Sequence, residues 1–260
     1  MRKALTIAGS DCSGGAGVQA DIKTMTVHKV YAMSVVTALT AQNTTGVYGI
    51  FEATPEFVAQ QLDCVFTDIV PDAVKIGMVS GAGIIGAIAE KFKLYQPRNV
   101  VLDPVMVASG GGKLLSDDAA EALVSKLFPL ADLITPNIPE AEILSGIPIK
   151  QPADMLAAAK KIAATQSGGV LVKGGHLTGS ADDVLYWKGE VIWIHGERVG
   201  NPNTHGTGCT LSSAIACGLA YGRGMEKSVR DAKAYVTQAL RAGLDFGMGV
   251  GPLDHCCDCI

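Results

Sequence analysis

The sequence predicts an α/β protein in which helices cover both faces of a mostly parallel central β-sheet. Short apolar runs rich in β-branched residues alternate with segments of helical spacing along nearly all of the 260 residues, and this alternation is typical of βαβ units. Hydrophobic residues make up 48% of the chain and charged residues 18%, which provides enough apolar material for a large buried core. We predict a single domain over residues 1–260, with its core at about 4–245 and a C-terminal tail at 252–260.

The first half of the chain opens with a strand and a glycine turn. Apolar runs bounded by Gly, Pro or Asp predict strands. Residues such as Phe57, Val58 and Leu62, which share one face at helical spacing, predict a helix. On these grounds we predict strands at 4–9, 31–41, 72–77 and 99–105, helices at 18–29, 55–66 and 82–95, and a short hairpin or loop at 44–53.

The second half continues the alternation and ends in two helices. Residues 183–199 alternate in polarity on both sides of the pair Lys188-Gly189, which suits a tight turn, so this segment predicts a β-hairpin. The other predicted elements are strands at 132–137 and 168–175, helices at 116–128, 138–146 and 153–166, a helix that begins at about Thr207, and a helix at 227–247.

Composition and charge exclude several classes of protein. The net charge of −4 provides no overall basic footprint for nucleic acid, and no apolar run approaches the roughly 20 residues of a membrane span. The start, MRKALTIAGSDC, meets Gly, Ser and Asp too early for a secretory signal. Seven cysteines, an odd number, suit reduced thiols rather than a disulfide framework. We expect a soluble cytoplasmic protein with no nucleic-acid or membrane partner.

The end of the chain, DHCCDCI, is unusual. His255 with Cys256, Cys257 and Cys259 could in principle hold zinc, but their spacing is too compressed for an ordinary closed zinc site. We expect these residues to form a frayed tail.

The stretch NTHGTGCTLSS places small, flexible residues directly before an apolar helix. A glycine turn at a helix N-terminus directs unpaired N–H groups and the positive end of the helix dipole outward, which suits phosphate. We therefore predict an anion hole at Gly206, Thr207 and Gly208. Cys209 stands at the helix mouth, where a thiolate is favoured, with a buried structural thiol as the alternative. His205 could act as a base, or it could pack against the turn or cap it.

Charged residues recur at the predicted strand ends, where ligands gather in such sheets. Asp103 and Glu140 are carboxylates at or just after two strand ends, and Lys173 follows a third. Taken singly, they suit an Asp-Pro turn, a first-turn helix carboxylate and a strand-end lysine. Together with the anion hole they indicate phosphoryl transfer, because magnesium with phosphates needs few carboxylates and a lysine can approach phosphate as a point charge.

No familiar nucleotide motif accompanies these residues. GGAGVQ lacks the GxGxxG spacing of a dinucleotide-binding turn, and the chain contains no GxxxxGK[ST] loop. A nucleotide would therefore be bound by another arrangement.

The same segments closely resemble the hydroxymethylpyrimidine (phosphate) kinases of thiamin biosynthesis, which are members of the ribokinase-like superfamily. The NTHGTGC block alone indicates the superfamily, whereas TALTAQNT together with NTHGTGCTLSSAIA is much more specific to the pyrimidine kinases. The resemblance implies a ribokinase-like fold and a homodimer. The blocks that carry it follow the family's order from about residue 4 to 245: AGSDCSGGAGVQADIKT, TALTAQNTTGV, VKIGM, VLDPVMVASGGGKLL, LITPNIPEAEIL, VLVKGGH and NTHGTGCTLSSAIA.

The resemblance also implies a reaction and its cofactors. The family uses ATP and Mg²⁺ to phosphorylate 4-amino-5-hydroxymethyl-2-methylpyrimidine, and then phosphorylates the monophosphate to the diphosphate. Residues that match the family's motifs receive implied roles. Gln42 and Asp21 hydrogen-bond the pyrimidine, Ala16, Met78 and Val105 pack on its ring, Asp103, Glu140 and Asn137 organise magnesium and phosphates, Lys173 serves the nucleotide, and Cys209 with Gly206, Thr207 and Gly208 forms the catalytic end of the site.

The sequence departs from the family's pattern at two places, and three alternatives to the family's activity stay open. Cys12 stands where the family commonly has Ser, and the glycine-rich segment 109–112 is expected to be a lid that orders over the bound substrates. The nearest alternative activity is that of a pyridoxal kinase, or of a kinase with both activities, because some relatives with this same cysteine accept pyridoxal. A silent binder of thiamin precursors is disfavoured by the intact magnesium and anion residues. A ribokinase-like sugar kinase is disfavoured by the thiol of Cys209, where those relatives carry a catalytic aspartate.

Overall fold

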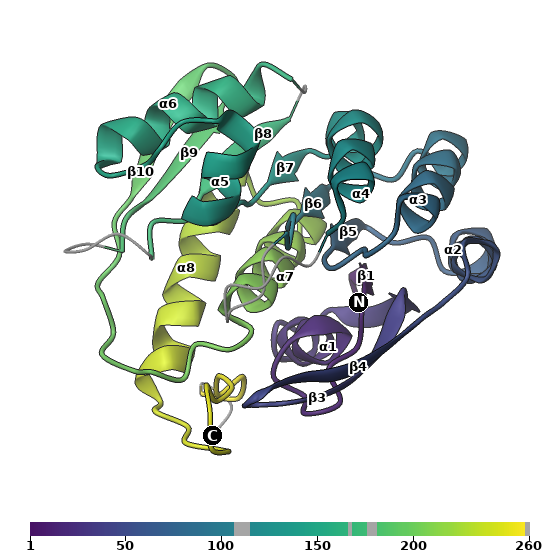
Figure 1. Cartoon of the computed structure of the whole chain (residues 1–260), viewed down its shortest axis with the longest axis horizontal. Coiled ribbons are helices and arrows are strands. Elements are labelled where there is room, and N and C mark those ends of the chain that lie inside the picture. Colours follow the sequence, from purple (N-terminus) through teal and green to yellow (C-terminus); the bar gives the residue numbers. More distant parts are fainter. Residues whose placement is uncertain (107–114, 166–167, 176–180, 258–260) are drawn as a thin grey trace.

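The strands of the protein form one large sheet and one small one (Figure 1). The computed structural model describes residues 1–106, 115–165, 168–175 and 181–257, and the predicted lid at 109–112 lies outside them. The strands are β1 (Lys3–Ala8), β2 (Tyr31–Val36), β3 (Ala38–Asn43), β4 (Gly46–Glu52), β5 (Ala73–Ile76), β6 (Val100–Leu102), β7 (Leu133–Ile134), β8 (Gly169–Val172), β9 (Asp183–Trp187) and β10 (Glu190–Ile194).

The eight-stranded sheet has the order β10-β9-β8-β7-β6-β5-β1-β2. Its strands from β8 to β2 run parallel, while β9 pairs antiparallel with β8 and with β10. β3 and β4 pair with each other in a separate antiparallel hairpin. The mostly parallel central sheet predicted from the sequence is confirmed.

The helices lie on both faces of this sheet, as predicted (Figure 1). They are α1 (Gly17–Val27), α2 (Pro55–Asp68), α3 (Ala82–Tyr95), α4 (Asp117–Ala122), the π-helical turn η1 (Leu123–Leu127), the 3₁₀ turn η2 (Phe128–Leu130), α5 (Ile138–Ser145), α6 (Pro152–Ala163), α7 (Thr207–Ala220) and α8 (Met225–Arg241). α1, α7 and α8 pack on one face, and α2, α3, α4 and α6 cover the other. Across the described residues, every helix is too short or too polar to cross a membrane.

Alternation along the buried strands divides the core between the two faces. Leu5 and Ile7 of β1 belong to the cluster that packs against α2, α3 and α6, whereas Val101 of β6 and Leu171 of β8 belong to the cluster that packs against α7 and α8. All four side chains are fully buried, and burial of such a side chain contributes roughly 1.5–3 kcal/mol to folding. The helices are thereby fixed over the sheet, and the loops that follow the parallel strands are gathered at one edge.

The hairpin predicted at 183–199 is confirmed as β9 and β10. Its turn residues Lys188 and Gly189 both have positive φ, 51° and 82°, as a type I′ turn requires.

The structure has shorter strands than predicted at 31–41, 99–105, 132–137 and 168–175, and the first and third of these show a clear cause. The run at 31–41 is split at Thr37, whose N–H donates to the carbonyl of Ala8 at the end of β1, and beyond this residue the chain leaves the main sheet to pair with β4. The strand predicted at 132–137 is only β7, because Pro136 has no N–H to donate and Asn137 already caps α5.

The chain end that we expected to fray is packed against the helices instead. Leu253 and His255 are 2% and 4% exposed. The His255 imidazole lies 3.1 Å from the Thr210 hydroxyl on α7, and the Tyr235 hydroxyl on α8 donates to the carbonyl of His255 at 2.7 Å. The prediction of a frayed tail is therefore wrong for the residues up to Cys257, because these partners bury the segment.

His255 makes the stability of the fold depend on pH. Burial, together with the nearby Lys23 ammonium, lowers the pKa of His255 to about 4, whereas an unfolded histidine titrates at about 6.5. Between these values the unfolded chain binds the extra proton. The stability is therefore complete above about pH 6.5 and is lost as the pH falls toward 4, by up to roughly 3 kcal/mol. Urea denaturation at about pH 7 and about pH 4.5 measures the loss.

The matched variant is His255→Gln, which keeps a hydrogen-bonding group beside Thr210 but cannot titrate. Between the same two pH values, we expect its free energy of unfolding to fall by about 2–3 kcal/mol less than that of the parent. Parallel pH profiles for the two proteins would contradict a buried neutral imidazole.

Candidate active site

The predicted site residues follow strands that end at the same edge of the sheet. Met78 follows β5, Asp103 follows β6, Asn137 follows β7 and Lys173 follows β8. In a parallel sheet these carboxyl ends lie side by side. A hollow of about 430 Å³ lies at the opposite, amino-terminal ends of the strands and contains none of the predicted site residues; its lining is Met1, Arg2, Lys3, Asp72 and Tyr221.

Asp103 and Lys173 form a buried ion pair. Lys173 Nζ lies 2.7 Å from Asp103 Oδ1, and Thr135 Oγ1 donates to the same oxygen at 3.1 Å. Burial alone would lower the pKa of Lys173, but the Asp103 and Glu140 carboxylates outweigh it and raise the pKa. The ammonium is therefore held charged at the strand ends, where a phosphate could meet it.

Glu140 joins the loop after β6 to the start of α5. Its Oε1 accepts from the Met106 N–H at 3.1 Å and its Oε2 accepts from the Asn137 N–H at 2.8 Å. Asn137 Oδ1 accepts from the Glu140 N–H in return, which completes a capping box. Burial raises the pKa of Glu140; Lys173 opposes this rise and Asp103 adds to it. Glu140 is thus a first-turn helix carboxylate that also lies in the electric field of the Asp103–Lys173 pair.

The segment predicted to form an anion hole, Gly206 to Gly208, makes a sharp turn at the start of α7. Gly206 has a φ of 84° and lies so close to the Gly15 carbonyl that a side chain would overlap it. The Thr207 N–H donates to the carbonyl of Thr204 at 3.2 Å. Gly206 caps α7 without a side chain, so the next N–H groups of the first turn, those of Gly208 and Cys209, are the ones that face another acceptor. A Cβ at Gly208 would lie 3.1 Å from Asp103 Oδ2 and 3.3 Å from Lys173 Nζ. The start of α7 is therefore brought directly beside the Asp103–Lys173 pair.

Cys209 lies half-buried in the first turn of α7, but its thiol is not poised as a thiolate. Burial raises the pKa of the thiol, and Asp21 and Asp103 add to the rise, while Lys75 opposes it. The prediction that the helix mouth would favour the thiolate is wrong, because desolvation and two carboxylates outweigh the helix terminus.

A second buried ion pair escaped the sequence analysis. Lys75 of β5 is 0% exposed, and its ammonium lies 2.8 and 2.9 Å from the two carboxylate oxygens of Asp21. Thr6 Oγ1 and Ser213 Oγ donate to the same carboxylate at 2.5 and 2.7 Å. The contact between Asp21 and the pyrimidine that the resemblance implied is therefore not available, since the carboxylate is fully buried and both oxygens are engaged. The overlooked signal was a lysine in the middle of the apolar strand DAVKIG.

The residues implied to contact the ring fall into two groups. Ala16 and Gln42 surround the turn after β1, and the Met78 methyl group lies so close to Gly9 of that turn that a side chain there would have to displace it. Val105 instead follows β6, where its φ of 26° is uncommon for a β-branched residue. Their contact with a ring stays a prediction.

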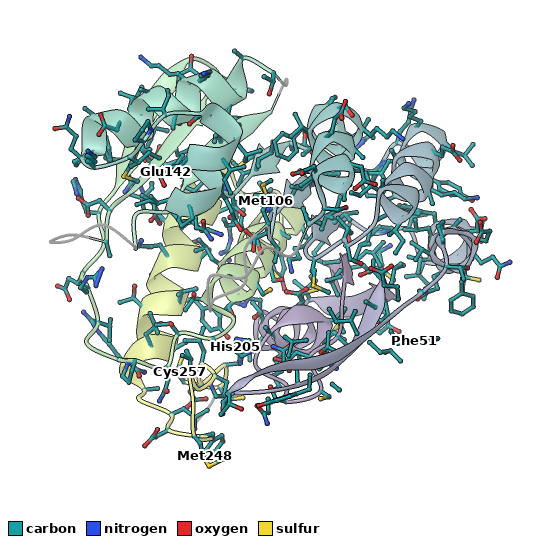
Figure 2. The ribbon with its side chains drawn as sticks, in the orientation of Figure 1. Phe51, Met106, Glu142, His205, Met248 and Cys257 are labelled. Atoms are coloured by element: carbon teal, nitrogen blue, oxygen red, sulfur yellow. The ribbon has the colours of Figure 1, made fainter. Side chains whose placement is uncertain are left out.

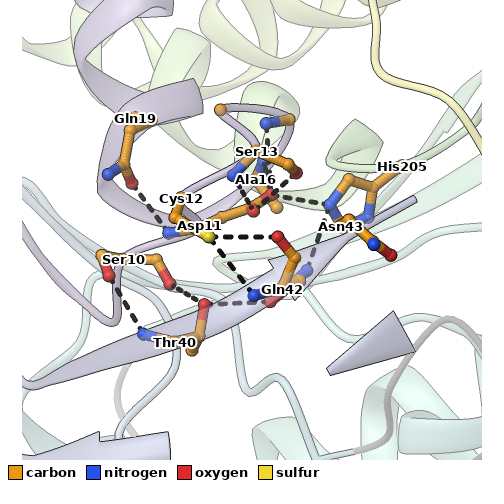
Figure 3. Close-up of polar contacts among 12 residues, drawn as sticks. Ser10, Asp11, Cys12, Ser13, Ala16, Gln19, Thr40, Gln42, Asn43 and His205 are labelled. Carbon is orange, nitrogen blue, oxygen red and sulfur yellow. Dashed lines mark hydrogen bonds and ion pairs between the residues drawn. The ribbon is translucent and has the colours of Figure 1, made fainter. Parts of the chain in front are cut away.

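His205 is part of a polar network that the sequence did not reveal (Figure 3). Its Nε2 lies 2.8 Å from Asp11 Oδ2 and 3.3 Å from Gln42 Nε2. Its backbone N–H donates to the carbonyl of Gly251, and Figure 2 shows it near the C-terminal segment that carries Cys257. Asp11 was not singled out, although its place in the GSD turn after the first strand was a signal.

Positioning and stabilisation of negative charge supply most of the catalysis in phosphoryl transfer. The start of α7 approaches the strand-end Asp103 and Lys173, an arrangement of helix N–H groups and an ammonium that suits both requirements. Fold and site together define a phosphotransferase of the ribokinase-like class.

Comparison with known proteins identifies the family within that class. The family described as phosphomethylpyrimidine kinase matches residues 11–254. The thiamine biosynthesis bifunctional protein ThiED of Geobacter sulfurreducens is 50% identical over 96% of this chain, which spans about half of that protein, 51%. The hydroxymethylpyrimidine/phosphomethylpyrimidine kinase of Streptomyces coelicolor is 45% identical, over 96% of this chain and 93% of its own. The chain belongs to the phosphomethylpyrimidine kinase family, as its sequence blocks implied.

Solved structures agree with this assignment. The phosphomethylpyrimidine kinase of Clostridium difficile 630 has a TM-score of 0.84 at 46% identity, covering 92% of this chain and 99% of its own. The pyridoxal kinase of Bacillus subtilis, in an ADP complex, has a TM-score of 0.91 at 38% identity, covering 99% and 98%. The pyridoxal kinase of Staphylococcus aureus, in complex with AMP-PCP and pyridoxal, has a TM-score of 0.90 at 33% identity, covering 98% and 93%.

Proposed function

We propose that this chain transfers a phosphoryl group from ATP to 4-amino-5-hydroxymethyl-2-methylpyrimidine, and then phosphorylates the monophosphate to the diphosphate. Membership of the phosphomethylpyrimidine kinase family supports the reaction. One structural observation supports the site most directly. The start of α7 lies so close to Asp103 and Lys173 that a Cβ atom at Gly208 would already contact both side chains. A phosphate held there would meet helix N–H groups and an ammonium at once.

The described residues fit a nucleotide that brings its own magnesium. A related pyridoxal kinase has been solved with AMP-PCP, which supports an ATP-like nucleotide here. Asp103 and Glu140 supply two carboxylates, and across the described part of the chain no three His, Cys, Asp or Glu side chains are grouped to hold a metal by themselves. Mg²⁺ is commonly bound by one or two carboxylates together with phosphates, so this sparse set fits. When bound, the ion would neutralise charge on the phosphate oxygens.

The chain's own residues divide the remaining tasks. Lys173 and Asn137 serve the nucleotide side, and the N–H groups at the start of α7 stabilise the charge that develops on the transferred phosphoryl group. We assign to Cys209 the role of general base, which accepts the proton of the attacking hydroxymethyl group. Because the pKa of its thiol is raised, the thiol has to ionise before it can accept this proton, and turnover should follow the thiolate fraction.

An ADP-release assay with four acceptors tests the proposal. The acceptors are the hydroxymethylpyrimidine, its phosphate, pyridoxal and ribose. We expect ADP release with the first two. Release with pyridoxal alone would favour the second candidate function, that of a pyridoxal kinase. This candidate is retained because two pyridoxal kinases resemble the chain with TM-scores of 0.91 and 0.90. Release with ribose alone would overturn the choice of substrate class.

Gln42→Leu should weaken binding of the pyrimidine by about 1–3 kcal/mol, because the amide both donates and accepts and its loss leaves ring groups unpaired. Calorimetry without nucleotide measures this. Gln60→Leu, which removes an exposed amide on α2, is the matched control and should bind like the parent. Equal affinity of the Gln42→Leu variant and the parent would remove Gln42 from the substrate site.

We propose that the homodimer implied by the family forms through the β3–β4 hairpin. Leu39, Tyr48 and Phe51 on these strands are 55%, 70% and 74% exposed, and Phe51 lies at the outer side of the hairpin in Figure 2. Apolar groups exposed together mark interaction surfaces. Phe51→Glu should halve the mass found by sedimentation, whereas Leu94→Glu, which charges an isolated exposed leucine on α3, should not. A parent protein that sediments as a monomer would contradict the proposal.

A further inference from the structure

The buried carboxylate of Asp11 accepts hydrogen bonds at both of its oxygens. It is 1% exposed, and Ser13 N–H and Oγ donate to Oδ1 at 2.9 and 2.7 Å while the N–H groups of Gly15 and Ala16 donate to Oδ2 at 3.1 and 2.9 Å. Burial alone would raise the pKa of Asp11, but hydrogen bonds from His205 and Ser13 lower it to about 2. The carboxylate is therefore ionised at neutral pH and can only accept.

This fixes the role of the His205 ring. Its Nε2 lies 2.8 Å from Asp11 Oδ2, and since the carboxylate has no proton to give, Nε2 must carry one and donate it. An Nε2–H cannot accept from anything else. This single hydrogen points mainly to Asp11, and the Gln42 amide at 3.3 Å can take only the weaker branch of a bifurcated hydrogen bond. An amide NH₂ group at that place would face the N–H and be repelled by it, so the amide oxygen belongs there.

The other end of the same amide leads to the same conclusion. Thr40 Oγ1 has one hydrogen, and it donates this to the carbonyl of Ser10 at 2.8 Å. Toward Gln42, at 3.2 Å, the Thr40 hydroxyl is thus free only to accept, so it requires the amide nitrogen. The two ends of a glutamine amide are nearly identical in shape and are told apart by their partners. Figure 3 draws the amide with Nε2 toward His205 and Oε1 toward Thr40. Both partners require the opposite assignment, with Oε1 toward His205 and Nε2 toward Thr40.

We infer that His205, held by Asp11, and Thr40, held by Ser10, lock the Gln42 amide in this one orientation and so set the substrate specificity of the site. The lock leaves one Oε1 lone pair and one Nε2–H of Gln42 for a ligand, in a fixed order. An aminopyrimidine offers a complementary edge, an amino donor beside a ring-nitrogen acceptor. Beside its hydroxymethyl group pyridoxal carries an aldehyde, which is an acceptor, where the pyrimidine carries the amino donor. An amide that is free to turn could donate to this aldehyde, whereas the locked amide cannot present its two ends in the reverse order. His205 is in this sense a positioning residue, and the inference rests on the proposed contact between Gln42 and the pyrimidine.

His205 also joins two parts of the site. The next residue, Gly206, opens the anion hole, so the imidazole that orients the ring-binding amide belongs to the same turn that begins α7. A ring bound in the wrong orientation would direct its hydroxymethyl group away from that turn. The lock therefore affects KM for the pyrimidine and the choice between acceptors, while KM for ATP depends on other residues.

The experiment compares kcat and KM for both acceptors in four variants. His205→Leu removes the donor, and His205→Gln restores an N–H at about the same reach. Thr40→Val releases the opposite end of the amide. His195→Leu is the matched control, because His195 also pairs with an aspartate, Asp182 at 3.2 Å, but its side chain is 83% exposed.

We expect His205→Leu and Thr40→Val each to raise KM for the hydroxymethylpyrimidine about tenfold and to lower the preference for it over pyridoxal about tenfold, with KM for ATP unchanged within about twofold. His205→Gln should recover most of the preference, and His195→Leu should match the parent. If His205→Leu does not fold, Thr40→Val decides the question. An unchanged preference in the variants that do fold would overturn the lock, provided that the parent phosphorylates the pyrimidine; a parent that does not would overturn the proposed function instead.

A second readout needs no turnover. Long-range ¹H–¹⁵N NMR of the parent reports which imidazole nitrogen of His205 carries a proton. A protonated Nε2 supports the lock, and an unprotonated Nε2 overturns it.

Discussion

Replacing Cys209 by alanine should lower kcat by about 10²- to 10⁴-fold, the usual contribution of a general base. The fold should persist, because the half-buried thiol in the first turn of α7 contributes little packing. KM for the pyrimidine should change less than kcat, since the amide of Gln42 is retained. Steady-state kinetics and the thermal midpoint measured on the same preparation separate loss of chemistry from loss of structure.

The pH profile makes this prediction more specific. Since the pKa of the Cys209 thiol is raised above its ordinary value, the kcat of the parent should rise with pH from about 7 to about 10 without reaching a plateau at the ordinary thiol range. Cys209→Asp, whose carboxyl group ionises at lower pH than a thiol in the same surroundings, should reach its plateau at lower pH than the parent and should turn over faster than Cys209→Ala. A fully active alanine variant would refute the catalytic role. An aspartate variant that unfolds while alanine is tolerated would indicate a structural thiol.

Lys75→Met should lower the free energy of unfolding by about 3–5 kcal/mol, the usual cost of breaking a buried ion pair by removing one partner. Burial alone would lower the pKa of Lys75, but the Asp21 carboxylate raises it well above its usual range. With the lysine gone, Asp21 would be left as an unpaired charge in the core, supported only by the Thr6 and Ser213 hydroxyls. Urea denaturation of the variant and the parent measures the difference.

Two controls isolate the buried charge. Lys75→Met combined with Asp21→Asn should recover a large part of the loss, because the asparagine amide is neutral and its oxygen can still accept from Thr6 or Ser213. Arg223→Met breaks the exposed ion pair with Asp231, whose atoms lie 2.9 Å apart, and should cost no more than about 1 kcal/mol. A Lys75→Met variant that is as stable as the Arg223→Met variant would contradict the importance of the buried pair.

The sequence predicted the fold well where a local pattern decided the structure. Alternation of apolar residues around Lys188-Gly189 specified a hairpin because a type I′ turn needs positive φ at both positions, and the structure has it. The glycines at 206 and 208 likewise predicted a helix opened by a sharp turn. Asp103, Glu140 and Lys173 were found because parallel strands deliver their carboxyl ends to one edge.

Long-range polar partners could not be predicted in the same way. The pattern of a single strand shows that Lys75 is surrounded by apolar neighbours, but it does not show that Asp21, on a helix, lies against it. The ionisation of the Cys209 thiol was misjudged for a related reason. The helix terminus was visible in the sequence, whereas the burial that raises the pKa of the thiol depends on everything packed around it. The docked C-terminal segment depended on Tyr235 and Thr210, which are distant along the chain.

The contact between Asp11 and His205 joins positions 194 residues apart. During synthesis of the chain, Asp11 is therefore made well before its partner. At the usual 5–20 residues per second of synthesis, roughly 10–40 s pass between the formation of the two peptide bonds that introduce these partners. Ser213 reaches Asp21 after a comparable delay, across 192 positions. Through most of its synthesis the nascent chain therefore carries the first half of the site without the second. A chain that stops short of His205 lacks both the imidazole beside Gln42 and the turn that opens α7, so it cannot form the site even in part.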